Sequence, residues 1–138
     1  MNTYMNETTL ALVNNEIETF NRRASKLDTV ICKQFDVYKR ILTEKLDSIM
    51  RDIWGARDLG YITHDEAVGI YGDIERMKNG AVGAFRTAEK ERIGEREYVI
   101  RYDVYAYGYT REEAEKAYDE EWFITTLFFC NSINLLQL

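Results

Sequence analysis

The sequence of 138 residues contains no proline, one histidine and two cysteines. Without proline, no residue forces a helix to kink or stop, so we expect a chain built mainly of uninterrupted elements. Collagen-like and proline-rich disordered classes are excluded. Because 46% of the residues are hydrophobic and 13% aromatic, the chain can bury enough apolar surface to fold. Its length predicts a single domain over residues 1–138.

The scarcity of cysteine and histidine limits the chemistry that the chain can perform. Cys32 and Cys130 are far apart in sequence and have apolar neighbours, which favours reduced, packed thiols over a disulfide. The motifs HExxH, CxxC, GxGxxG, GxxxxGK[ST] and GxSxG do not occur. We therefore expect no metal, no cofactor and no enzymatic activity. The alternative is a small enzyme that uses Cys130, with His64 as its base, or a pair of carboxylates.

The sequence has no pattern that predicts export or membrane insertion. The amino end lacks a basic leader followed by an apolar core, so we expect a cytoplasmic protein. The most apolar segment, from Trp122 to Leu138, is interrupted by polar residues and is shorter than the ~20 apolar residues that span a bilayer. We expect this segment to form part of the core or to be covered by another chain.

The first half of the chain shows a helical hydrophobic pattern. From Leu10 to Ile53 apolar residues recur every three or four positions on one helical face, and Ile31 lies in the middle of this stripe. The pattern predicts one helix from Glu7 to about Arg57, which would be about 75 Å long at ~1.5 Å per residue. Such a stripe must be covered by the rest of the chain or by a second copy. Otherwise, the helix breaks near residues 25–28 and forms a hairpin.

Shorter elements follow. Thr63 and Glu66 have the spacing of a capping box, which predicts the start of a short helix that ends at Asn79 and Gly80. A weaker helical pattern covers residues 81–93. Together with the pattern of the first half, these signals predict a mostly α fold whose first part, residues 1–60, is a long helix or helix pair and whose second part, residues 61–95, holds shorter helices.

The third part, residues 96–138, is expected to combine a strand with a helix. Residues 97–107, EYVIRYDVYAY, are rich in β-branched and aromatic side chains with a period of two, which predicts a strand. A lone strand leaves its backbone unpaired, so its partner would come from the tail, another protomer or a target protein. The capping-box pair Thr110 and Glu113 then predicts a helix through about Trp122. The expected fold thus includes one or two C-terminal strands.

Charge and tyrosine are concentrated in the second half. Residues 61–138 hold nine Lys/Arg and fifteen Asp/Glu, which accounts for the whole net charge of −6. Six of the ten tyrosines lie between positions 98 and 118. An acidic surface with exposed tyrosines suits recognition of a basic protein groove, whereas the alternative is a solvated helix face. The predicted partner-binding residues are Trp54, Tyr105, Tyr107, Tyr109, Glu112, Glu113, Glu115, Asp119 and Glu120.

In composition the chain resembles the inhibitors that phages and other mobile elements encode, such as anti-CRISPR and anti-restriction proteins. The resemblance rests on the lack of proline, the acidic charge, the many tyrosines and the missing catalytic motifs. It implies a protein-binding module that inhibits a nucleic-acid-handling protein. Direct binding to nucleic acid or membrane is not expected, since the pI is near 4.9. The alternative is a homodimeric helical scaffold or regulator.

Overall fold

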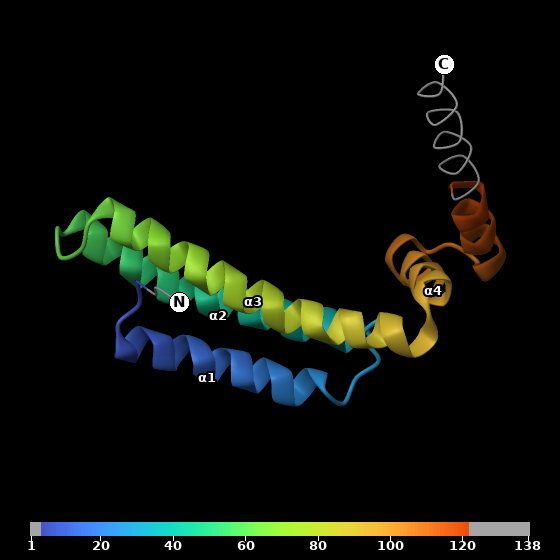
Figure 1. The fold of residues 1–138 in the computed structure, drawn as a ribbon, viewed down its shortest axis with the longest axis horizontal. Helices are drawn as coiled ribbons and strands as arrows, with labels where there is room; N and C mark the ends of the chain where they lie inside the picture. Colours follow the sequence, from blue (N-terminus) through green and yellow to red (C-terminus); the bar gives the residue numbers. More distant parts are fainter. Residues whose placement is uncertain (1–3, 122–138) are drawn as a thin grey trace, which may run out of the picture. The chain divides into compact units, whose positions relative to one another are not determined.

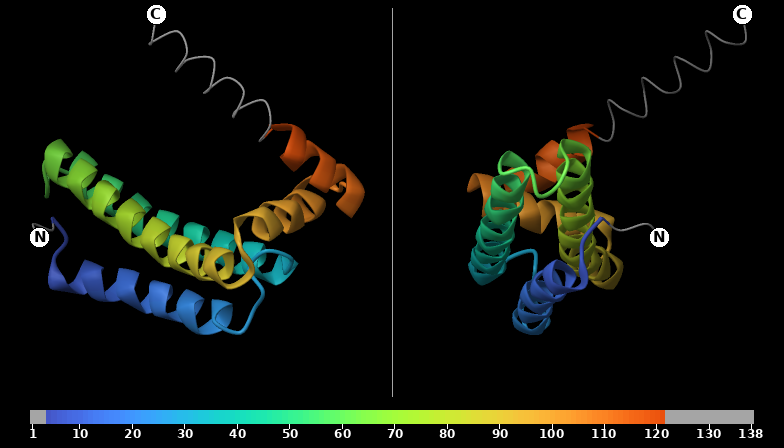
Figure 2. Two further views of the ribbon diagram at one scale, coloured as in Figure 1. Left: turned by 45° about the vertical axis from the view of Figure 1, so that its right-hand side comes forward. Right: turned by 90° about the vertical axis from the view of Figure 1, so that its left-hand side faces the viewer.

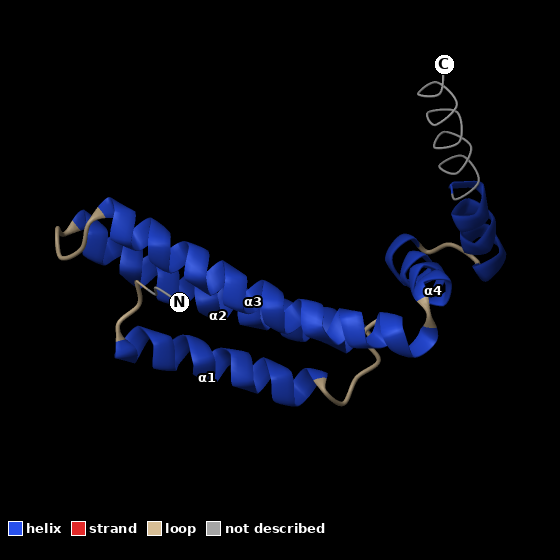
Figure 3. Ribbon diagram, in the orientation of Figure 1, coloured by secondary structure: helices blue, strands red, loops and turns tan. Residues whose placement is uncertain are grey.

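The computed structural model describes residues 4–121, and this part of the chain contains helices and loops but no strand (Figure 3). Four helices are α1 (Glu7–Ala24), α2 (Lys33–Asp58), α3 (His64–Ile93) and α4 (Glu95–Tyr107). A further helix, here named the acidic helix, begins at residue 111 and is described as far as residue 121. The predicted helical character is confirmed.

The chain divides into two compact units, Met1–Ala88 and Glu89–Leu138. We refer to them as the first and the second unit. The single domain expected over residues 1–138 stays a prediction, since a compact unit need not fold on its own.

The first unit is a bundle in which α1, α2 and the greater part of α3 lie side by side (Figures 1 and 2). Three phenylalanines, one from each helix, meet in its core. The ring centroids of Phe20 and Phe35 are 5.6 Å apart, and Phe85 lies 5.9 Å from Phe20 and 6.3 Å from Phe35. The other buried apolar residues of this core are Met5, Val13, Ala24, Leu42, Leu46, Met50, Ile70 and Ile74.

The single helix expected over residues 7–57 is wrong, and the alternative hairpin is what the structure shows. α1 ends at Ala24, and α2 begins only at Lys33. Between them the Asp28 carboxylate accepts a hydrogen bond from the Val30 amide at 3.0 Å, a local turn that competes with helix. The turn buries Val30 completely and leaves Ile31 53% exposed. Ile31 is therefore not a core residue, contrary to the stripe pattern.

The turn between α2 and α3 follows the capping signals of the sequence. Gly60 adopts a φ of 81°, in the left-handed region that favours glycine. The Glu66 amide donates to the Thr63 hydroxyl at 3.0 Å, and the Thr63 amide donates to the Glu66 carboxylate at 3.3 Å. The predicted capping box is confirmed.

α3 is one continuous helix, so the break expected at Asn79 and Gly80 is wrong. Gly80 lies in its interior, where a Cβ atom would meet nothing within 4 Å. The helix continues because the residues beyond the glycine pack on the bundle core, including Ala81, Val82 and Phe85. Tertiary packing here outweighs the low helix propensity of glycine.

The segment before α1 is attached to α3. The Tyr4 amide donates to the buried Asp73 carboxylate at 3.1 Å, and Asp73 also forms an ion pair with Arg76. The Tyr4 ring lies against Gly69, where even a Cβ atom would collide with it. Met5 is buried in the core. The chain entering α1 is thus anchored to a helix almost seventy residues away in sequence.

The strand expected over residues 97–107 is wrong, because these residues form α4. Glycines with positive φ flank it, Gly94 at 89° and Gly108 at 70°. A helix pairs the backbone groups of the segment within itself, whereas a strand would need a neighbour that is not present in the described part of the chain. The ion pair between Glu97 and Arg101, four residues apart, also favours the helix.

Two expectations fall outside the described residues: the packing of Trp122–Leu138 and the state of Cys130. Cys32 is a free thiol that is half-buried at the start of α2. Within residues 4–121, no helix combines the length and apolar character needed to cross a bilayer.

Replacing Gly80 by alanine is expected to stabilise the protein. The change adds helix propensity at a site with open space, so the free energy of unfolding should rise by about 0.5–1 kcal/mol in urea denaturation. Gly60→Ala is the matched control, because a Cβ there also meets nothing within 4 Å but φ is positive. It should cost about 1–2 kcal/mol. A destabilised Gly80→Ala variant would contradict this account of α3.

Candidate protein-binding surface

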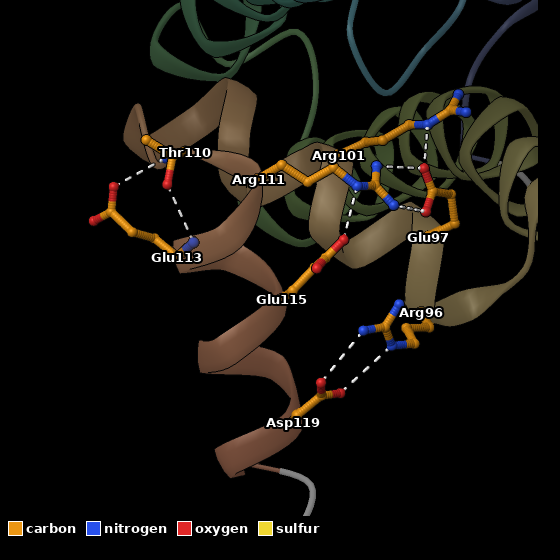
Figure 4. A network of polar contacts seen from close by, with 8 residues as sticks. All are labelled: Arg96, Glu97, Arg101, Thr110, Arg111, Glu113, Glu115 and Asp119. Carbon is orange, nitrogen blue, oxygen red and sulfur yellow. Dashed lines mark hydrogen bonds and ion pairs between the residues drawn. The ribbon is translucent and has the colours of Figure 1, made fainter.

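In the second unit, α4 is followed by a short turn and the acidic helix. The turn begins at Gly108, whose φ of 70° ends α4 in the left-handed conformation. The Glu113 amide then donates to the Thr110 hydroxyl, and the Thr110 amide donates to the Glu113 carboxylate, both at 3.2 Å. This capping box, drawn in Figure 4, confirms the predicted helix start. Ile100 of α4 and Ala114 of the acidic helix are fully buried.

An ion-pair network centred on Glu97 joins α4 to the acidic helix (Figure 4). The Arg111 guanidinium donates two hydrogen bonds to the two Glu97 oxygens, at 2.8 and 2.6 Å. Its Nε donates to Glu115 at 2.8 Å, and Arg101 donates to Glu97 at 3.0 Å. The bidentate pairing fixes the two helices in a defined geometry.

A second contact lies further along the same two helices. The Arg96 guanidinium donates to both oxygens of Asp119, at 3.4 and 3.3 Å, which raises the pKa of Arg96. Lys116 and Glu120, four residues apart within the acidic helix, approach to 3.9 Å. Much of the negative charge on this helix is therefore balanced inside the second unit.

The network lowers the pKa of Glu97 from its ordinary value of 4.5 to about 2, since hydrogen bonds from Arg111 and then from Arg101 favour the ionised carboxylate. Hydrogen bonds from Glu97 and Glu115 correspondingly raise the pKa of Arg111. Both groups are accessible to solvent, so the network fixes geometry more than it adds stability.

The residues that remain available to a partner lie around the turn. Tyr107 is 66% exposed and Tyr109 40% exposed, and their ring centroids are 5.7 Å apart. Tyr105, by contrast, is half-buried. Glu112 is exposed and has no ion-pair partner among residues 4–121. We name the set Tyr107, Tyr109 and Glu112 the tyrosine–acid surface.

The structure gives different positions to the other acids that the sequence singled out. Glu113 is engaged in the capping box, Glu115 pairs with Arg111 and Asp119 pairs with Arg96. Asp119 attaches the acidic helix to α4, whereas Glu113 and Glu115 stabilise the acidic helix from within. Glu120 is exposed, and within residues 4–121 its one ion pair is the long contact with Lys116.

Trp54 belongs to the first unit and is half-buried against the bundle core. The Arg57 guanidinium lies 4.6 Å from the centre of its ring, and the rings of Tyr71 and His64 lie 6.3 and 6.5 Å from it. The His64 Nδ1 accepts a hydrogen bond from Arg57 at 3.3 Å. The indole is thus covered by neighbours and does not project as a free anchor.

The sequence analysis did not single out Arg96, and it missed the pairing of Glu97 with Arg101 because both were assigned to a strand over residues 97–107. The signal was the four-residue spacing of Glu97 and Arg101, which is typical of a helix. Within residues 4–121, no group of three or more His, Cys, Asp or Glu side chains is arranged to hold a metal. Comparison with family models, curated proteins and solved structures finds no match to this chain.

The pKa of Glu97 gives a testable pH dependence. Because the pKa is depressed in the folded state, the stability that Glu97 contributes is complete above its ordinary value of 4.5 and is lost as the pH falls to about 2. Glu97→Gln should lower the melting temperature at neutral pH, and its difference from the wild type should shrink over this interval. Glu112→Gln is the control, since Glu112 has no ion-pair partner in the described chain, and should follow the wild-type curve. A constant difference for Glu97→Gln would contradict the assignment.

Proposed function

We propose that the tyrosine–acid surface binds a basic surface of another protein and thereby inhibits it. One observation carries the proposal: two exposed tyrosines in contact with each other lie three to five residues before an exposed glutamate that no base neutralises within residues 4–121. Tyrosine offers a large contact area with a hydrogen-bonding tip and loses little side-chain entropy on binding.

The charge of the second unit supports a basic partner. Residues 89–121 hold eleven Asp/Glu and six Lys/Arg, an excess of five negative charges out of the total of six. Each internal ion pair neutralises one positive and one negative charge, so the excess of negative charge in residues 89–121 remains after pairing. An acidic surface of this kind speeds association with a basic one and disfavours other partners.

A basic groove that normally takes nucleic acid is the target class that fits these features. Such a groove binds phosphates through Lys and Arg, and carboxylates on a rigid helix offer the same side chains an alternative set of oxygens. The ion pairs from α4 keep the acidic helix in one position, which lowers the entropy cost of binding. Occupying the groove would exclude the nucleic acid, and this is the inhibitory role that we propose.

The test compares charge-matched variants of the full chain. Glu112→Lys should weaken binding to proteins captured from native host cells, and Tyr107→Ala with Tyr109→Ala should mainly raise the dissociation rate. Glu44→Lys, an exposed acid on α2, changes the net charge equally at another place and is the control. Bound proteins are identified by mass spectrometry, and dissociation is followed by surface-based kinetics.

Competition with duplex DNA and a change of salt concentration test whether the contact is electrostatic and whether it occupies a nucleic-acid groove. Added duplex DNA should displace the captured protein, and raising the salt concentration should slow association, because exposed charges are screened beyond about 8 Å at physiological ionic strength. If Glu112→Lys, the tyrosine variant and Glu44→Lys all retain the same proteins at low and high salt, the tyrosine–acid surface is not the binding site.

A further inference from the structure

The rings of Tyr107 and Tyr109 form the aromatic part of the tyrosine–acid surface. Their centroids are 5.7 Å apart, and their planes are inclined to each other by 36°. Tyr107 is 66% exposed and Tyr109 40% exposed. Among residues 4–121, no side-chain cation lies over either ring. The pair thus offers aromatic faces to a cation from another molecule.

The spacing of the two rings suits a single flat cation. A cation–π contact places the cation within about 6 Å of a ring centroid. With the centroids 5.7 Å apart, a point about 5 Å from one centroid can also lie about 5 Å from the other. A planar group that lies parallel to one ring is inclined to the other by 36°. These distances allow one flat cation to contact both tyrosines.

Arginine already makes this contact elsewhere in the chain. Three guanidinium groups of the first unit lie over aromatic rings, 4.6–5.3 Å from the ring centre: Arg23 over Tyr38, Arg57 over Trp54 and Arg86 over Phe35. Arginine suits this role better than lysine because its guanidinium is flat and weakly hydrated, whereas the lysine ammonium is compact and strongly hydrated. The tyrosine pair is therefore expected to discriminate between the two basic side chains.

Glu112 supplies a carboxylate that is near the two tyrosines in the chain. It follows Tyr109 by three residues, so the two Cα atoms are at most about 11 Å apart. Glu112 is exposed and has no ion-pair partner among residues 4–121. The preceding residue, Arg111, is already paired with Glu97 and Glu115. The Glu112 carboxylate is thus open to a guanidinium from outside.

We propose that the tyrosine–acid surface recognises an arginine side chain of its partner. The guanidinium packs on the rings of Tyr107 and Tyr109 and donates hydrogen bonds to the Glu112 carboxylate. The same kind of hydrogen bonding joins α4 to the acidic helix, where Arg111 donates to both oxygens of Glu97. Recognition of arginine in this way rests on the proposed function, since it names the side chain through which the basic partner binds.

Two short peptides of equal charge test this recognition on the full chain. In each peptide glycine alternates with a basic residue, arginine in one and lysine in the other, and both carry blocked ends and a fluorescent label. Their affinities are measured by fluorescence anisotropy at low ionic strength. The arginine peptide should bind the wild type at least about threefold more tightly, because a cation–π contact at an exposed site changes an affinity by about two- to fivefold.

Paired tyrosine variants show whether the rings cause this preference. Tyr107→Leu combined with Tyr109→Leu keeps apolar side chains but removes both aromatic faces, so the arginine peptide should fall to the affinity of the lysine peptide. Tyr107→Phe combined with Tyr109→Phe keeps the faces and should retain the preference. Tyr61→Leu is the matched control, since it changes an 80% exposed tyrosine of the first unit, and should retain it as well. Circular dichroism of each variant should match the wild type.

Glu112→Gln tests the carboxylate. It should weaken both peptides, and the arginine peptide more, because only a guanidinium donates two parallel hydrogen bonds to a carboxylate. Glu44→Gln removes an exposed acid of α2 and is the charge-matched control, which should bind both peptides almost as the wild type does.

Equal affinity of the wild type for the two peptides would overturn the inference. A preference for arginine that survives the loss of both rings, or that is also lost in Tyr61→Leu, would overturn it too. None of these results would remove the proposed function, because a lysine-rich groove also binds an acidic surface. Failure of the proposed function is read separately, from proteins that Glu112→Lys captures as well as the wild type does.

Discussion

The contact among Phe20, Phe35 and Phe85 determines the architecture of the first unit. Phe20 and Phe35 are fifteen residues apart, so on one straight helix they would be separated by about 22 Å along the axis. Their ring centroids are 5.6 Å apart instead, which requires the chain to reverse between α1 and α2. Phe85 can join them only because α3 continues past Gly80. The hairpin and the uninterrupted α3 are therefore both needed to bring the three rings together.

Much of the helical structure could be predicted from local patterns. The two capping boxes at Thr63 and Thr110 appear as predicted, because a cap depends on side chains only three residues apart. The break at residues 25–32 was harder to predict from the sequence, because the apolar residues stay on the same helical face before and after it. There, an Asp28 turn and the burial of Val30 outweigh a pattern that would have placed Ile31 inside.

The error at residues 97–107 has a different origin. The β-branched and aromatic residues of this segment favour strand as single residues, but their preference is weak and depends on a neighbouring strand. The helix is stabilised by pairs such as Glu97 with Arg101 and by Arg111 from outside the segment. The candidate surface was therefore found only in part. Its tyrosines and acids could be recognised from composition. Which carboxylates pair within the second unit and which remain open to a partner could not, because the pairing depends on α4 being a helix.

The attachment of Tyr4 to Asp73 has a consequence for local fluctuations of the molecule. Most of the bundle is closed by neighbouring helices, but this hydrogen bond spans 69 residues and holds residues 4–6, among which Met5 is the one buried apolar side chain. Segments with few buried contacts open locally at a lower free energy than the core. Residues 4–6 are therefore expected to open at a lower free energy than the phenylalanine contact, and their opening would uncover the Asp73 carboxylate and the surface of α3 at Gly69.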